Sequence, residues 1–346
     1  SGGDVLLDPS PSDDGEDDMK DNVSGGAATR ERAFELFIFT GSTYLPGGTV
    51  ATTNIDLNGT FTMEANAVTV AGVWDATGGA YSSTGTVTFT AGGGVNLTAN
   101  GNSASAAFNH VVFSNAAGTW TTQDALDVDG NLTITNGILD ANGNGINVAG
   151  NWSNAATFTS GANTVTFDGG STQTINAGGT GIGVDDTTKD FNNITVSGAT
   201  LQIVTSELEV DGNLTIDATK TLDLNGQTLD LNGTFVNNGT VQLTGAETIG
   251  MGTMDTNSGL FKYVGTSSVT LTSAITNYFN LEFDESGTSN PTYTLPDVNT
   301  TVSGVLTLTD GNLTFDNDKN LIISDTGATG TALSILGSQT LTNTGT

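Results

Sequence analysis

An aromatic-Asn pair recurs three times along this chain, at steps of 83 and 88 residues: Phe108-Asn109, Phe191-Asn192 and Phe279-Asn280. About 20 to 25 residues after each pair, a Gly-x-Leu-Thr segment begins, at Gly130, Gly212 and Gly304. Self-similarity at a nearly fixed period is the signature of repeat architectures, in which each unit stacks on its neighbours. The period predicts a repeat protein before any single residue is considered.

A shorter step lies inside the long one, because Gly130-Asn131-Leu132 is followed about twenty residues later by Gly150-Asn151-Trp152. Between the glycines, apolar and polar residues alternate, as in Leu132-Thr133-Ile134, which is the period of a strand with one buried face. Strands of a sandwich need not resemble one another, whereas stacked coils share one environment. We therefore expect an all-β parallel β-solenoid, a right-handed β-helix with about 20 residues per coil and about 15 coils.

Composition fits this architecture and excludes several others. The chain has 47 Gly, which suit tight corners, and no Cys, so neither disulfides nor thiolate metal sites are expected. With 37 acidic and 7 basic residues it offers no basic patch for nucleic acid, and no apolar run reaches the ~20 residues of a membrane span. The chain begins at Ser1, which suggests a removed signal peptide or a piece of a longer protein. An extracellular or cell-surface protein is expected.

Residues 1–33 are an acidic arm or linker with three interpretations. The arm could be a solvated leader. It could be a Ca²⁺ site, because five carboxylates in six residues suit a hard cation: Asp13, Asp14, Glu16, Asp17 and Asp18. Its apolar residues could instead dock on a neighbouring copy by strand addition to an exposed edge: Val5, Leu6 and Leu7. We expect no cofactor, with Ca²⁺ as the one candidate.

The solenoid is expected to cover residues 34–346, with an N-terminal cap at about 34–50 and repeats from about 51 to 346. The cap would be a short helix from Ala27 or a first strand, and its apolar residues are candidates for subunit contact: Phe34, Leu36, Phe37 and Phe39. The last residues, Leu341–Thr346, still follow the coil pattern without a charged or Pro-rich stop. We therefore expect an open C-terminal end and head-to-tail self-association.

Catalytic residues are scarce in the repeats. His110 is the one histidine, so a Ser-His-Asp triad or a multi-His metal site is not expected, and a structural role is favoured. A polyuronate lyase needs cations beside its substrate, which a chain of net charge -30 would repel. A glycoside hydrolase needs only two carboxylates, and the candidate acids lie in the two longest breaks of the repeat: Asp185, Asp186, Asp284 and Glu285.

The tryptophans and several aspartates fit recurring structural positions. Trp74 and Trp152 follow glycines at a 78-residue step, and Phe235 takes that place in the next copy, so packing is favoured over a sugar-stacking platform. Asp140-Ala-Asn-Gly lacks the Glu that would complete a calcium loop, since Asn151 stands there, and it matches the corner Asp223-Leu-Asn-Gly. Similar Asp-containing corners are expected at Asp129, Asp211, Asp230 and Asp310.

Three segments carry a resemblance to a known family: Gly150-Asn151-Trp152, Asn163-Thr-Val-Thr-Phe-Asp-Gly-Gly170 and Phe191-Asn-Asn-Ile-Thr-Val196. They resemble repeats of large secreted bacterial β-solenoid surface proteins of the adhesin and filamentous-haemagglutinin-like kind. The resemblance covers roughly residues 50–330 and implies architecture rather than activity. We expect a non-enzymatic structural protein, a filament subunit or an adhesin stalk, with surface glycans as candidate partners. The alternative is a carbohydrate-active enzyme or polysaccharide-binding β-helix, for which an acidic pair in a groove would be the evidence.

Overall fold

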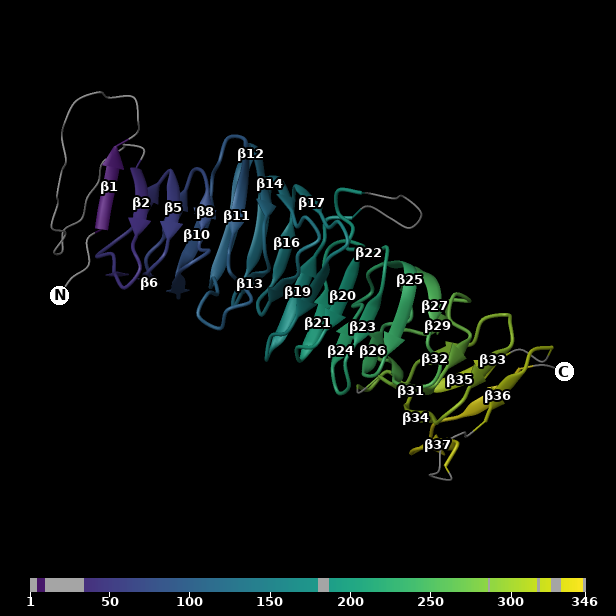
Figure 1. The fold of residues 1–346 in the computed structure, drawn as a ribbon. Helices are drawn as coiled ribbons and strands as arrows, with labels where there is room; N and C mark the ends of the chain where they lie inside the picture. Colours follow the sequence, from purple (N-terminus) through teal and green to yellow (C-terminus); the bar gives the residue numbers. More distant parts are fainter. Residues whose placement is uncertain are drawn as a thin grey trace. The chain divides into compact units, whose positions relative to one another are not determined.

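Figure 1 shows a computed structural model of the chain, in which the ribbon winds through successive stacked turns. It describes residues 5–9, 34–179, 187–285, 287–315, 318–324 and 331–344, with the backbone alone for residues 5–9 and 34. All regular elements in these ranges are strands, and they form a parallel β-solenoid of about 14 turns with about 20 residues per turn. The predicted fold class is confirmed, and the right-handed sense of the helix stays a prediction.

The chain divides into two compact units, Ser1–Thr166 with Thr187–Lys189, and Phe167–Asp186 with Asp190–Thr346. The first unit contains β1 (Val5–Pro9), β2 (Phe34–Ile38), β3 (Thr43–Tyr44), β4 (Val50–Thr52), β5 (Asn54–Leu57), β6 (Thr60–Glu64), β7 (Val68–Val70), β8 (Trp74–Asp75), β9 (Ala80–Ser83), β10 (Thr86–Phe89), β11 (Gly94–Thr98), β12 (His110–Thr122), β13 (Leu126–Val128), β14 (Leu132–Asp140), β15 (Ile146–Val148), β16 (Trp152–Asn154) and β17 (Thr157–Thr159). One strand, β18 (Thr164–Phe167), includes the boundary.

The second unit repeats the same construction. Its strands are β19 (Thr172–Asn176), β20 (Asn193–Val196), β21 (Thr200–Ile203), β22 (Leu208–Val210), β23 (Leu214–Ile216), β24 (Thr221–Asp223), β25 (Leu229–Asn237), β26 (Thr240–Leu243), β27 (Ile249–Met254), β28 (Leu260–Tyr263), β29 (Val269–Thr270), β30 (Asn277–Tyr278), β31 (Asn280–Asp284), β32 (Thr292–Thr294), β33 (Thr300–Val302), β34 (Leu306–Asp310), β35 (Asn312–Phe315), β36 (Leu321–Ile323), β37 (Leu333–Ile335) and β38 (Leu341–Asn343).

Each turn stacks in register on the one before it. Leu132, for example, pairs with Val111 on the preceding turn and with Trp152 on the following one, and all three side chains are buried. The polar residues between such positions face outward, so the alternation seen in the sequence becomes an apolar interior and a polar exterior. The core of each unit is therefore a column of stacked side chains.

The Asn-Gly corners form as expected at two equivalent places. Asn142 and Gly143 have φ angles of 49° and 77°, and Asn225 and Gly226 have 49° and 74°. In both corners the preceding Asp accepts a hydrogen bond of 2.9 Å from the Asn backbone N–H. Asn and Gly are the residues that adopt this left-handed backbone most readily. The corner interpretation of Asp140 and Asp223 is confirmed.

The first turn begins with a strand, which is the second form expected for the cap. β2 pairs in parallel with β5 on one edge, and on the other edge it pairs antiparallel with β1. The inward side chains of β2, Leu36 and Ile38, are 2% and 1% exposed. Ala27, where the alternative helix would start, lies outside the described residues.

Buried tyrosines of the second unit predict a loss of stability in alkali. Burial raises the pKa of Tyr278 to about 12, while its hydroxyl donates to the Ile275 carbonyl at 3.0 Å. Since unfolded tyrosine loses its proton near pH 10, stability is fully present below about pH 10 and falls as pH rises through about 12, by about 3 kcal/mol for this group. Urea unfolding at pH 8 to 12 should show this fall, and Tyr278→Phe should reduce it. An equal fall in the variant would contradict the assignment.

Candidate functional site

The recurring Asn and Gly of the sequence form one repeated contact between turns, which we call the corner clamp. In it, a side chain on one turn accepts a hydrogen bond from the backbone N–H that follows a glycine on the next turn. Asn131 Oδ1 accepts from Asn151 N at 2.9 Å. A Cβ on Gly150 would lie 2.6 Å from Asn131 Oδ1 and 2.3 Å from the Gly130 carbonyl carbon. Only glycine fits there without displacing the backbone.

Five corner clamps are present among the described residues, with acceptor-to-nitrogen distances of 2.8 to 2.9 Å: Asn54 with Val73, His110 with Asn131, Asn131 with Asn151, Asn193 with Asn213, and Asn280 with Val305. Each donor follows a glycine. The clamp thus explains why the glycine cassettes recur. The acceptor in one clamp is His110, for which the sequence favoured a structural role. Its ring nitrogen Nδ1 takes the role that an Asn amide oxygen takes elsewhere.

Substitution of His110 should separate the clamp from any chemical role. His110→Asn restores the usual acceptor, so its free energy of unfolding should lie within about 0.5 kcal/mol of the native chain, whereas His110→Ala should cost about 1 kcal/mol because the Asn131 N–H loses its partner. Urea unfolding followed by circular dichroism measures both. Equal stability of the alanine variant and the native chain would refute the clamp at this position.

The tryptophans lie inside the solenoid. Trp74, Trp120 and Trp152 are at most 1% exposed. The Trp74 ring contacts Tyr81 and Phe108 at centroid distances of 5.1 and 4.9 Å. A sugar-stacking platform needs an exposed ring face, so the packing interpretation is confirmed.

Of the four candidate hydrolase acids, the structure describes Asp284 and Glu285. Asp185 and Asp186 lie outside the described residues. Asp284 faces outward on β31 beside Glu282, and Lys262 Nζ contacts both carboxylates, at 2.6 and 3.8 Å. A lysine that contacts two carboxylates offsets part of their negative charge, as in a surface ion-pair network.

Glu285 closes its own turn. Its carboxylate accepts from the Ser289 hydroxyl at 2.7 Å and from the Gly287 backbone N–H at 3.1 Å. The Ser289 hydrogen bond lowers the pKa of Glu285. A glycosidase general acid needs a raised pKa, so this environment is opposite to the one that the reaction requires.

Two shallow depressions lie on the first unit. One, of about 250 Å³, is lined by Thr86, His110, Val111, Val112, Asn131 and Thr133. The other, of about 390 Å³, includes a single acid, Asp129, in its lining. Neither depression holds the carboxylate pair that glycoside hydrolysis uses.

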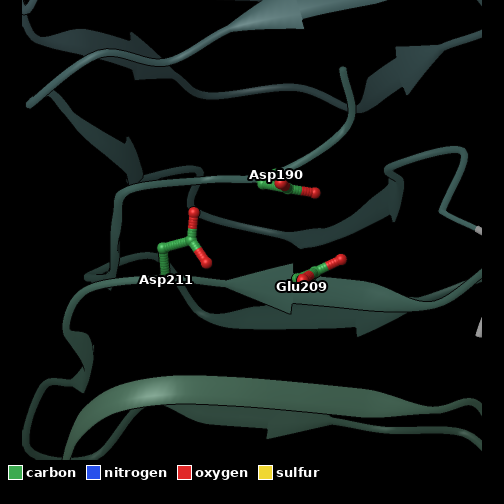
Figure 2. A group of neighbouring side chains, drawn as sticks. All are labelled: Asp190, Glu209 and Asp211. Atoms are coloured by element: carbon green, nitrogen blue, oxygen red, sulfur yellow. The ribbon is translucent and has the colours of Figure 1, made fainter. Parts of the chain in front are cut away.

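A carboxylate cluster that the sequence did not predict lies in the second unit, formed by Asp190, Glu209 and Asp211. One oxygen from each lies within 4.8 Å of the others, and Asp190 and Glu209 are buried while Asp211 is exposed. Figure 2 shows Asp190 on one segment of backbone and Glu209 with Asp211 on the next. Carboxylates are ligands that Ca²⁺ and Mg²⁺ prefer, but exposed acidic groups are common without an ion.

The cluster follows from the register of the turns. Phe191 forms a parallel β-bridge with Val210, so the residues before them, Asp190 and Glu209, lie beside each other on successive turns. On the following turn, Glu209 pairs with the buried Asp230. The spacings of 19 and 21 residues between these acids match the coil length and were the signal available in the sequence. The corner interpretation of Asp230 is wrong, because this residue lies inside β25. Asp211 also bonds the next turn, accepting from Asn232 Nδ2 at 3.0 Å.

The predicted subunit contacts have different surroundings. Val5, Leu6 and Leu7 lie in β1 and are paired with β2 of the same chain. Leu36 is buried in the core of its own turn, Phe37 is half-buried, and Phe39 is 47% exposed. Phe34 begins β2. The candidate calcium ligands of the leader lie outside the described residues: Asp13, Asp14, Glu16, Asp17 and Asp18.

Apolar side chains of the last described turn are exposed. Leu333 and Ile335 of β37 are 40% and 42% exposed, whereas their partners on the preceding turn, Leu306 and Leu308, are fully buried. Leu336 is 48% exposed. Among the described residues, no strand pairs with the second edge of β37.

Comparison with protein-family models, with curated proteins and with solved structures finds no match for this chain. In the part of the chain that the structure describes, no helix is long and apolar enough to cross a membrane.

Proposed function

We propose that this chain is a structural protein of the cell surface, a filament subunit or the stalk of an adhesin, which associates with other copies through its ends. The observation that carries the proposal is that the side chains that could have served catalysis or binding make structural contacts. The histidine, the recurring asparagines and the tryptophans hold one turn to the next, by corner clamps and core packing. A chain built in this way is suited to a mechanical function.

A further feature supports association between copies. The first turn carries an apolar strand, β1, whose pairing departs from the parallel repeat. The resemblance of the repeats to secreted bacterial surface proteins suits an extracellular filament or stalk, and the net charge of -30 would keep the outward faces soluble. Surface glycans are the other candidate partners, and we propose neither enzymatic activity nor a cofactor.

Deletion of residues 1–33 tests this proposal. The truncated chain should keep the far-ultraviolet circular dichroism of a β-protein but polymerise less than the full chain, because β1 is removed. Sedimentation velocity over a range of concentrations measures the assembly. If the truncated chain polymerises normally, the arm has no part in association.

Two substitutions separate the apolar strand from the acidic run. Val5→Asp with Leu7→Asp should reproduce the loss of assembly, whereas Asp13→Asn with Asp14→Asn should leave assembly unchanged. The reverse pattern would favour the acidic run, and addition of Ca²⁺ to the native chain would then show whether a cation is involved.

A further inference from the structure

The N-terminal strand β1 differs from the solenoid strands in the direction of its pairing. β1 runs antiparallel to β2 over five register pairs, from Val5 with Ile38 to Pro9 with Phe34, whereas solenoid strands such as β2 and β5, or β10 and β12, pair in parallel. β1 is therefore an added edge strand and not a coil of the repeat. It occupies the edge of β2 that is not already paired with β5.

The connection allows the same pairing to form between two copies. Residues 10–33 separate β1 from β2 in the sequence, so 24 residues join two strands that lie side by side. Fully extended, 24 residues span up to about 80 Å. An edge strand on so long a connection can reach the same edge of a second chain without any change in its contacts, which is the basis of domain swapping.

The two sides of this pairing are held unequally. β2 belongs to the stack of turns, and its Glu35 accepts a hydrogen bond of 2.7 Å from Asn54 Nδ2 on the next turn. β1 is joined to β2 along a single edge over five register pairs. A short edge strand of this kind opens more readily than the stacked parallel turns.

From these observations we infer that β1 is an exchangeable strand: it closes the first turn of its own chain and, on association, pairs in the same register with β2 of a second copy. The inference rests on the proposed self-association and specifies the contact made between N-terminal ends. The pairing within one chain then inhibits association, because the chain's own β1 must leave the β2 edge before β1 of a second copy can pair there.

The absence of cysteine allows a direct test by disulfide formation. Leu6 and Phe37 are register partners, and Cα atoms opposite each other in an antiparallel pair lie about 4.5 to 5.5 Å apart, within the range that a disulfide spans. Leu6→Cys and Phe37→Cys in one chain should form an internal disulfide that locks β1 on its own β2. The oxidised chain should lose self-association, and reduction should restore it.

Mixing two single variants detects the exchange itself. Chains with Leu6→Cys alone and chains with Phe37→Cys alone should give a covalent heterodimer whose yield rises with concentration. Leu6→Cys mixed with Thr60→Cys, which lies in β6 and pairs with Thr43, should give none beyond background.

The outcomes separate the inference from the proposed function. If the oxidised double variant assembles as well as the reduced one, and the mixed single variants give no specific heterodimer, strand exchange is refuted while self-association stands. If the native chain stays monomeric at every concentration tested, the proposed function fails and strand exchange fails with it.

Discussion

Replacing Gly233 by alanine is expected to unfold the second unit or to destabilise it by about 3 kcal/mol or more. A Cβ at this position would lie 1.9 Å from the Gly212 carbonyl oxygen and 2.5 Å from its carbon, so the main chain of one turn would have to move away from the next. No side-chain rotation can relieve a clash with backbone. The two turns would separate at the place where β23 and β25 are paired.

Gly170→Ala is the matched control in the same unit. A Cβ on Gly170 meets nothing within 4 Å, and this glycine does not have a positive φ. Its free energy of unfolding, measured in urea by circular dichroism, should stay within about 0.5 kcal/mol of the native value. Equal effects of the two substitutions would contradict the close stacking of turns at Gly233.

Trp74→Ala should be the most damaging core substitution in the first unit, with a cost of about 3 to 5 kcal/mol. The ring is fully buried and contacts four other aromatic rings, those of Phe61, Tyr81, Phe89 and Phe108. Its removal leaves a cavity that the rigid stack of turns cannot easily close. Thermal unfolding should show a clearly lowered midpoint.

Trp74→Phe and Phe39→Ala are the controls for this prediction. The first keeps an aromatic ring in the cavity and should cost less than the alanine variant. The second truncates an exposed ring, 47% accessible, and should change stability little. A Trp74→Ala chain that is as stable as the native one but loses glycan binding would reverse the packing interpretation.

The architecture could be predicted from the sequence because similar short motifs recur at a nearly fixed spacing along the whole chain. In a coil of about 20 residues, positions about 20 residues apart lie in the same environment. Positions 130 and 150 are therefore both glycine, because both lie where successive turns are in contact. The corners at Asn142 and Asn225 could be predicted for a local reason, since Asn-Gly favours left-handed backbone.

Local sequence did not predict the conformation where contacts between turns override the preference of a short motif. Asp223-Leu-Asn-Gly226 forms a corner, with Gly226 at φ 74°, whereas Asp230-Leu-Asn-Gly233 continues as strand β25. The difference is that Gly233 lies against the backbone of the preceding turn, while a Cβ on Gly226 would have its nearest neighbour at 3.7 Å. Contacts with a residue about twenty positions away decide whether the motif forms a corner or a strand. The four residues of the motif alone therefore do not predict its conformation.

The carboxylate cluster was missed for a related reason. Asp190, Glu209 and Asp211 become neighbours only once the register between turns is known, and the sequence offered many acids at similar spacing. The antiparallel β1 was equally hidden, because Val5-Leu6-Leu7 is a short apolar group whose partner strand is not implied by any repeat. Strand addition to a neighbouring copy was one of three interpretations that the sequence left open, and the structure pairs this group with β2 of its own chain.

The central claim, that this protein is a structural element that assembles from copies of itself, is tested most directly by negative-stain electron microscopy of the purified native chain over a range of concentrations. We expect linear assemblies whose number and length increase with concentration. Isolated particles of uniform size at every concentration would contradict the claim, and turnover of a glycan by such particles would favour the carbohydrate-active alternative.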